Sequence, residues 1–233
     1  MRSPAAPPFL NFMTFRYHQE MNRVVAETLS EDSLIADIGS HDGYMARSMA
    51  NAGHRVVCVD LDLEPLQVGS KENQVRSSES VNRLSFVCGD VLRLMFRKNS
   101  LDAVTSTAML QVVHPDDIPS ALGEMQRVTK PGGLNGLKAY AGSPEIVRAK
   151  PNYKIFEYGE LRQFYETNGW EVIFEMEYQD PNDFRRNGNG SITSYSSIVA
   201  RKPLPASRII EDRERYLQWL ERADPEACEY IQF

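Results

Sequence analysis

The sequence is poor in cysteine and has no long hydrophobic run. Its three cysteines, Cys58, Cys88 and Cys228, are odd in number and widely spaced, which indicates a reducing compartment rather than a disulfide framework. No stretch reaches the roughly 18 consecutive apolar residues of a membrane-spanning helix, and the N-terminal segment has Arg2 and several prolines instead of a signal peptide's apolar core. We therefore expect a cytoplasmic protein with no membrane partner.

Positive charge is also in short supply. Against 32 Asp and Glu, the 233 residues include 26 Lys and Arg, which gives a formal net charge of −6. No basic run could attract a phosphate backbone, so we expect no nucleic-acid partner. The hydrophobic fraction of 42% is that of a globular chain, and the length suits one domain with an appendage.

Short β-rich segments alternate with stretches of helical spacing, which is typical of a parallel sheet with helices on both faces. The apolar runs predict strands at 34–38, 55–59, 84–88, 101–105, 136–140, 171–178 and 191–201. The helical spacing predicts helices at 16–29, 44–52, 64–79, 118–129 and 158–168. Asn187-Gly-Asn-Gly190 favours an antiparallel hairpin of the last two strands. We predict a doubly wound, Rossmann-like α/β fold with a mostly parallel sheet of about seven strands.

Three regions are expected along the chain: an N-terminal helical cap (1–29), the Rossmann-like domain (30–202) and a C-terminal helical appendage (203–233). The aromatic residues of the cap either pin a helix to the core or form a lid over a site. The appendage has a helical pattern over 207–223 whose apolar face suits packing or a homodimer. The cap aromatics are Phe9, Phe12, Phe15 and Tyr17.

The segment Asp37-Ile-Gly-Ser-His-Asp-Gly43 follows the first predicted strand and precedes a helix. Its glycines let the backbone pass close to a ligand, and the helix N-terminus supplies free N–H groups that suit a carboxylate. Asp60 ends the second strand 21 residues after Gly39, where an acidic side chain binds ribose hydroxyls in nucleotide-binding folds. Asp90 ends the third strand.

Three acids at strand ends, with no GK[ST] phosphate loop, favour a ligand that has ribose and adenine but no phosphate chain. S-adenosylmethionine (SAM) is such a ligand. Each acid also has a plainer explanation, because aspartate is common in turns and helix caps.

From Arg16 to Lys202 the chain resembles the class I SAM-dependent methyltransferases. The resemblance implies that the loop of residues 37–43 holds the methionine part of SAM, that Asp60 binds ribose and that Asp90 with Val91 holds adenine. His41 stands where the family has glycine, so its imidazole either contacts the ligand or leaves the backbone further away. The cofactor-binding residues that the resemblance implies are Arg16, Asp37, Gly39, His41, Gly43, Asp60, Leu61, Asp90, Val91, Thr107 and Met109.

A closer resemblance is to the tellurite-resistance branch of these enzymes, through Thr129-Lys-Pro-Gly-Gly133 and Gly159-Glu-Leu-Arg162. Where that branch has cationic groups suited to an oxyanion, this chain has other residues, which argues against tellurite or selenite as its substrate. These residues are Asn182, Asp183 and Gly190.

Methyl transfer from a sulfonium is an in-line displacement, so the chief task is to align a small-molecule acceptor in a dry pocket. If the acceptor is an amine or hydroxyl, His18 is the best candidate base, because its reference pKa lies near neutrality. Tyr140 and Tyr178, at strand ends, fall where an acceptor pocket should open. No Cys/His cluster has metal-ligand spacing, so we expect no structural metal.

Two other functions stay open at the level of sequence. The ligand's own α-amine could displace methylthioadenosine and form azetidine-2-carboxylate, as in SAM-cyclising synthases of the same fold. The loss of substrate-binding cations and the aromatic cap both suit this reaction. Alternatively, the chain is a SAM-binding module without catalysis.

Overall fold

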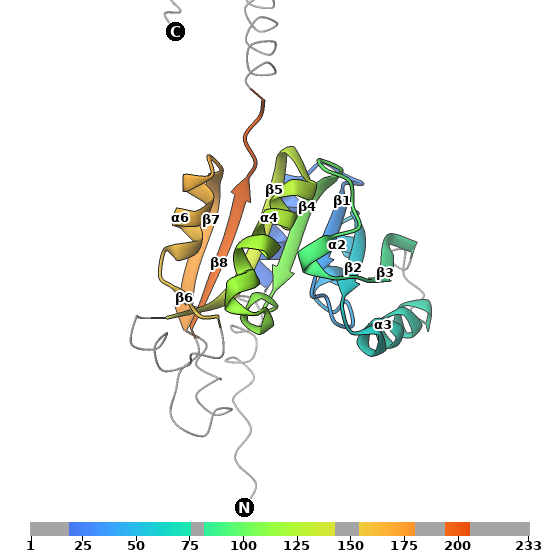
Figure 1. Ribbon diagram of the computed structural model, residues 1–233. Coiled ribbons are helices and arrows are strands. Elements are labelled where there is room, and N and C mark those ends of the chain that lie inside the picture. The colour runs from blue at the N-terminus through green and yellow to red at the C-terminus, as the bar shows by residue number, and fades with distance from the viewer. Residues whose placement is uncertain (1–18, 76–81, 143–153, 180–193, 206–233) are drawn as a thin grey trace, which may run out of the picture. The chain divides into compact units, whose positions relative to one another are not determined.

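The computed structural model describes residues 19–75, 82–142, 154–179 and 194–205. The strands in these ranges form one eight-stranded sheet, with helices packed against it (Figure 1). The strand order is β3-β2-β1-β4-β5-β8-β7, with β6 paired to β5. The predicted Rossmann-like fold is confirmed. By its internal contacts the chain divides into two compact units, Met1–Lys202 and Pro203–Phe233, and the sheet belongs to the first.

The strands are β1 (Leu34–Ile38), β2 (Arg55–Asp60), β3 (Leu84–Cys88), β4 (Leu101–Thr107), β5 (Thr129–Gly142), β6 (Phe156–Glu157), β7 (Glu171–Gln179) and β8 (Ser194–Arg201). The helices are a segment at residues 19–28, α2 (Ala46–Asn51), α3 (Leu63–Val75), α4 (Ile118–Val128) and α6 (Glu160–Thr167). Short 3-10 turns are η2 (Val91–Arg93), η3 (Leu110–Val112) and η4 (Pro115–Asp117).

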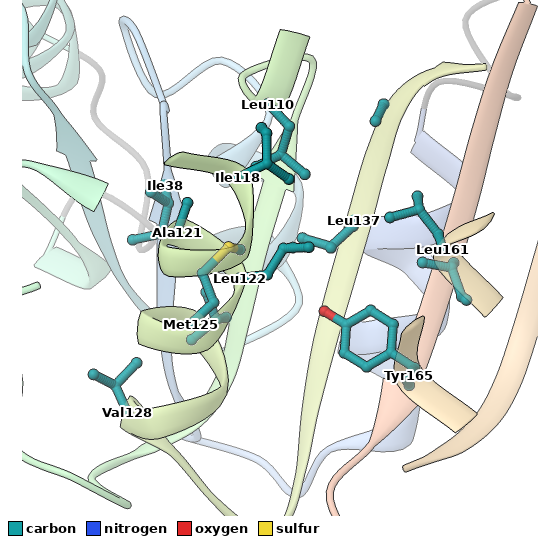
Figure 2. Close-up of a cluster of buried hydrophobic side chains, with 14 of the residues drawn as sticks. Ile38, Leu110, Ile118, Ala121, Leu122, Met125, Val128, Leu137, Leu161 and Tyr165 are labelled. Atoms are coloured by element: carbon teal, nitrogen blue, oxygen red, sulfur yellow. The ribbon is translucent and has the colours of Figure 1, made fainter. Parts of the chain in front are cut away.

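The sheet is covered on both faces, which explains why its central strands are apolar on both sides. On one face, α4 and α6 pack against β1, β4, β5 and β8, and Figure 2 shows Leu122 of α4 directed toward Leu137 of β5. On the other face, Met21 and Val25 of the helix at 19–28 pack with residues of α2 and α3. Because β1 to β5 are parallel, their carboxyl ends meet at one edge of the sheet.

The C-terminal strands β7 and β8 pair antiparallel, as the predicted hairpin requires. β8 lies between β5 and β7 and is antiparallel to both, so β7 forms the edge of the sheet and runs parallel to β5. β5 begins at Thr129, well before the predicted residue 136, and its register against β4 shifts between Leu101 and Ala103. The segment Thr129-Lys-Pro-Gly-Gly133 therefore lies inside a longer strand, at an irregularity in its register against β4.

No helix within the described parts of the chain is long and apolar enough to cross a membrane.

Candidate functional site

The loop after β1 is shaped by residues with left-handed backbone angles. Gly39 has φ of +71° and His41 has φ of 53°. The amides of Gly39 and Ser40 both donate to the carbonyl of Val59, at 2.8 and 3.1 Å, and hold the loop against the end of β2. A Cβ atom on Gly39 would lie 2.3 Å from Cγ of Met109, so only glycine allows the loop to lie against this segment.

The carboxylate of Asp60 joins this loop to the end of β2. Its Oδ2 accepts a hydrogen bond from the amide of His41 at 2.8 Å, and its Oδ1 accepts one from the amide of Asp62 at 3.0 Å. Each carboxylate oxygen can accept a further hydrogen bond. Asp60 therefore fixes the loop and still offers acceptors to the cavity that it lines.

Asp90 holds a comparable position at the end of β3. Its Oδ1 accepts a hydrogen bond from the amide of Leu92 at 2.9 Å and so caps η2. This cap places Val91 and Leu92 on the wall of the same cavity.

The cavity has a volume of about 530 Å³, within the range of small-molecule sites. It lies where the carboxyl ends of β1 to β4 meet, the usual position of ligands in parallel sheets. Of the predicted cofactor-binding residues, those that line it are Gly39, His41, Asp60, Leu61, Asp90, Val91, Thr107 and Met109. The structure thus brings together residues from four separate strand ends.

Two other predicted residues lie behind the cavity wall. Asp37 is buried, and its Oδ1 accepts a hydrogen bond from Oγ1 of Thr105 at 2.9 Å. Burial, aided by the charge of Asp60, raises the pKa of Asp37 to about 7, although the Thr105 hydrogen bond opposes this shift. Gly43 packs at the loop's end, where a Cβ would lie 2.9 Å from the Phe86 ring. Both residues shape the loop from beneath.

His41 lines the cavity, and its backbone amide as well as its imidazole is part of the site. Its amide is used by Asp60, and its side chain is 75% exposed with Nδ1 at 3.8 Å from Oδ1 of Asp42. The left-handed angle that favours glycine is therefore adopted by a histidine whose backbone and side chain both border the site.

The loop between β4 and α4 contributes residues that sequence reasoning missed. Val112, Val113, His114 and Asp117 line the cavity, and Nδ1 of His114 accepts the amide of Asp116 at 3.3 Å. The sequence carried a signal for them, since this segment directly follows a strand that ends at the site. Val112 is 74% exposed and gives the cavity an apolar rim.

The predicted catalytic tyrosines stand apart from the cavity. Tyr140 and Tyr178 do not line it, but they flank Tyr195, with ring centroids 5.2 and 5.5 Å from the Tyr195 ring. Arg16 and His18 lie outside the described residues, as do the cap aromatics and the residues that differ from the tellurite-resistance branch. Their roles stay predictions.

Comparison with known proteins gives the fold and the site a family context. Residues 36–135 match the methyltransferase domain family. A demethylmenaquinone methyltransferase of Thermobifida fusca is 33% identical over 118 residues, which are 51% of this chain and 48% of the relative. The chain thus spans about half the length of this curated relative.

Solved structures share the fold at low sequence identity. A SAM-dependent methyltransferase of Methanosarcina mazei superposes with a TM-score of 0.66 at 20% identity, over 78% of this chain and 98% of that one. The cyclase SpnF also superposes with a TM-score of 0.66, at 17% identity over 80% of this chain and 81% of its own. A fold that is similar to both does not by itself decide the reaction.

The fold is Rossmann-like, and residues 36–135 are similar to methyltransferase domains. The solved structure of the same fold from Methanosarcina mazei is described as a SAM-dependent methyltransferase, and the group that such enzymes use is S-adenosylmethionine. The residues present fit this group: Asp60 offers carboxylate acceptors, Leu61 and Val91 offer apolar walls, and the loop beside them is held by the amide of His41 on Asp60. The relation to the tellurite-resistance and SAM-cyclising enzymes stays a prediction.

Proposed function

We propose that the protein transfers the methyl group of SAM to a small-molecule acceptor. The observation that carries this proposal is the carboxylate of Asp60, which is bonded to the glycine loop and faces a cavity of suitable size. A carboxylate that two backbone amides hold beside a glycine-containing loop can accept hydrogen bonds from ribose hydroxyls, and this suits a nucleoside without phosphates.

Each wall of the cavity has a role in this proposal. Asp60 binds the ribose, Val91 and Leu61 flank the adenine, and the backbone near Gly39 meets the methionine carboxylate. Thr107, the last residue of β4, and Met109, just after that strand, border the reacting end. When bound, SAM supplies a methyl group activated by a sulfonium, and the chain's part is to align the acceptor and keep water out.

SAM cyclisation is the second candidate. The fold itself leaves this reaction open, because the cyclase SpnF shares it and the same fold can therefore carry reactions other than methyl transfer. In this reaction the protein would need no second substrate, and the α-amine of SAM would displace methylthioadenosine to give azetidine-2-carboxylate. A non-catalytic SAM-binding module is the third.

One assay separates these functions. The protein is incubated with SAM alone and then with a panel of phenols, carboxylates, amines, tellurite and selenite, and products are followed by mass spectrometry. We expect S-adenosylhomocysteine to form only when an acceptor is present. Methylthioadenosine from SAM alone would instead support cyclisation, and binding without any product would support a non-catalytic module. Tellurite or selenite methylation would establish the closer branch relation.

The same assay tests the predicted base. With a hydroxyl or amine acceptor, turnover by His18→Ala that equals the wild type would remove His18 from that role.

A further inference from the structure

A row of polar side chains crosses three strands beside the cavity. Lys138 of β5 pairs with Thr107 of β4 on one side and with Ser197 of β8 on the other. Paired residues of neighbouring strands project from the same face of a sheet, so these three side chains form one row. Thr107 also lines the cofactor cavity, and the row therefore extends from that cavity toward β8.

Lys138 is a buried cation packed against aromatic rings. Lys138 is 2% exposed. Its Nζ lies 4.3 Å from the ring centroid of Tyr195 and 5.5 Å from that of Tyr178. Tyrosine faces attract an ammonium group, and this attraction offsets part of the cost of burying the charge. The arrangement fixes a positive charge near the carboxyl end of β5.

The two hydroxyls beside Lys138 provide an independent observation. Oγ1 of Thr107 and Oγ of Ser197 are both buried, and neither has a hydrogen-bond partner within the described ranges of the chain. Ser197 is fully buried. A buried hydroxyl that lacks a partner is costly, and a polar atom of a bound ligand or a water is one way to satisfy it.

The next row of the same face is aromatic. Tyr140, Tyr195 and Tyr178 are register partners across β5, β8 and β7. Tyr178 and Tyr195 stack with an interplanar angle of 24°, and Tyr140 is tilted by 59° against Tyr195. Tyr195 is buried beneath the Lys138 ammonium, whereas Tyr140 and Tyr178 on either side of it are partly exposed, so these two rings are the ones that a planar organic molecule can contact.

We propose that Lys138, with the hydroxyls of Thr107 and Ser197, binds an anionic oxygen of the methyl acceptor, and that the tyrosine row contacts the rest of it. This inference rests on the proposed methyl transfer and extends it by naming the acceptor class, a carboxylate or an ionised acidic hydroxyl. The fixed ammonium favours an oxyanion over the neutral hydroxyl and repels a protonated amine. Lys138 is thus a specificity-determining residue.

The test is calorimetry on the full chain saturated with S-adenosylhomocysteine, using four probes that share a benzene ring. Benzoate tests a carboxylate, 4-nitrophenolate tests an ionised hydroxyl, benzyl alcohol is neutral and benzylamine is cationic. We expect at least one anion to bind about tenfold or more tighter than benzyl alcohol, and benzylamine to bind most weakly, in line with one desolvated charge interaction. The better of the two anions identifies the source of the oxyanion.

Substitutions then assign the effect to Lys138. Lys138→Met is expected to lower anion affinity to that of benzyl alcohol, while Lys138→Arg keeps the order of the probes. Lys130→Met is the matched control, because Lys130 is paired with Asp102 at 2.6 Å near the start of β5 and its loss should change no probe affinity. Equal affinities for all four probes, or unchanged anion binding by Lys138→Met, would overturn the proposal.

Two further measurements keep the outcome decisive. If the wild type does not bind S-adenosylhomocysteine, the proposed function is wrong. If it binds S-adenosylhomocysteine but shows no preference among the four probes, only the proposed acceptor site is wrong. If Lys138→Met does not fold, Ser197→Ala replaces it, and anion affinity should fall about three- to tenfold, the effect of one hydrogen bond. No change in Ser197→Ala would then count against the site.

Discussion

At the scale of single residues, Asp60 has two tasks that a variant can separate. Asp60→Asn keeps the shape and one carbonyl oxygen for the loop, but it removes the charge that strengthens hydrogen bonds to ribose hydroxyls. Because hydrogen bonds to charged groups contribute about 1.5–3 kcal/mol each, we expect S-adenosylhomocysteine affinity to fall roughly 10- to 100-fold. Asp60→Ala should bind more weakly still, since it also releases the amides of His41 and Asp62.

Isothermal calorimetry measures these affinities, and Asp32→Asn is the control. Asp32 precedes β1 and pairs with Arg55 and Arg83 at 3.3 and 3.0 Å, so its loss removes a carboxylate charge away from the cavity. The ribose assignment is wrong if Asp60→Asn and Asp32→Asn bind the ligand equally well.

At the scale of elements, the loop after β1 depends on contact with the segment after β4. Gly39→Ala would bring a Cβ to 2.3 Å from Met109 and would impose a left-handed backbone on alanine. We expect about 1–2 kcal/mol of strain from the backbone alone, and a further loss of ligand affinity of at least about tenfold because the loop must move. Calorimetry and urea unfolding measure the two effects.

Gly159→Ala provides the matched control for this change. Gly159 has φ of +78°, close to that of Gly39, but an added Cβ there meets no atom within 4 Å. It should therefore show the backbone strain without the loss of affinity. If both variants bind S-adenosylhomocysteine like the wild type, close packing of the loop does not shape the site.

Elements also differ in how far the sequence alone could predict them. The loop of residues 37–43 was predictable because its signal is local: a strand end, two glycines and a following helix lie within one short segment. The row of Thr107, Lys138 and Ser197 was not, because its members are far apart in sequence and meet only through strand register. A lysine inside an otherwise apolar predicted strand was the available signal.

The same distinction explains the strand that was predicted too short. The strand was predicted to begin only at residue 136, and Pro131, Gly132 and Gly133, which precede it, are residue types that usually interrupt strands. In the structure, Gly132 donates to the carbonyl of Lys202 and Lys202 donates to that of Gly133, both at 2.9 Å, so pairing continues through these residues. Backbone hydrogen bonds to the residue after β8 thus hold this segment in the sheet, although its local sequence does not favour a strand.

At the scale of the whole molecule, the buried carboxyl of Asp37 links stability to pH. Its pKa is raised by burial to about 7 from an ordinary value of 3.8 in the unfolded chain. The folded state therefore holds a proton that the unfolded state releases between about pH 4 and pH 7. The free energy of unfolding contributed by Asp37 is fully present below pH 4 and falls as pH rises, by about 4 kcal/mol across this window.

Carboxylates with lowered pKa, such as Asp102 and Glu124, act in the opposite sense and lose their contribution only at more acidic pH. Urea unfolding followed by tryptophan fluorescence at pH 5, 6, 7 and 8 measures the slope. Asp37→Asn keeps the shape of the buried group and its acceptor for Thr105 without the titration, so its stability should change less between pH 5 and pH 7. Parallel pH curves for this variant and the wild type would show that Asp37 is not the group that makes stability depend on pH, and that its environment beneath the loop keeps it in one protonation state.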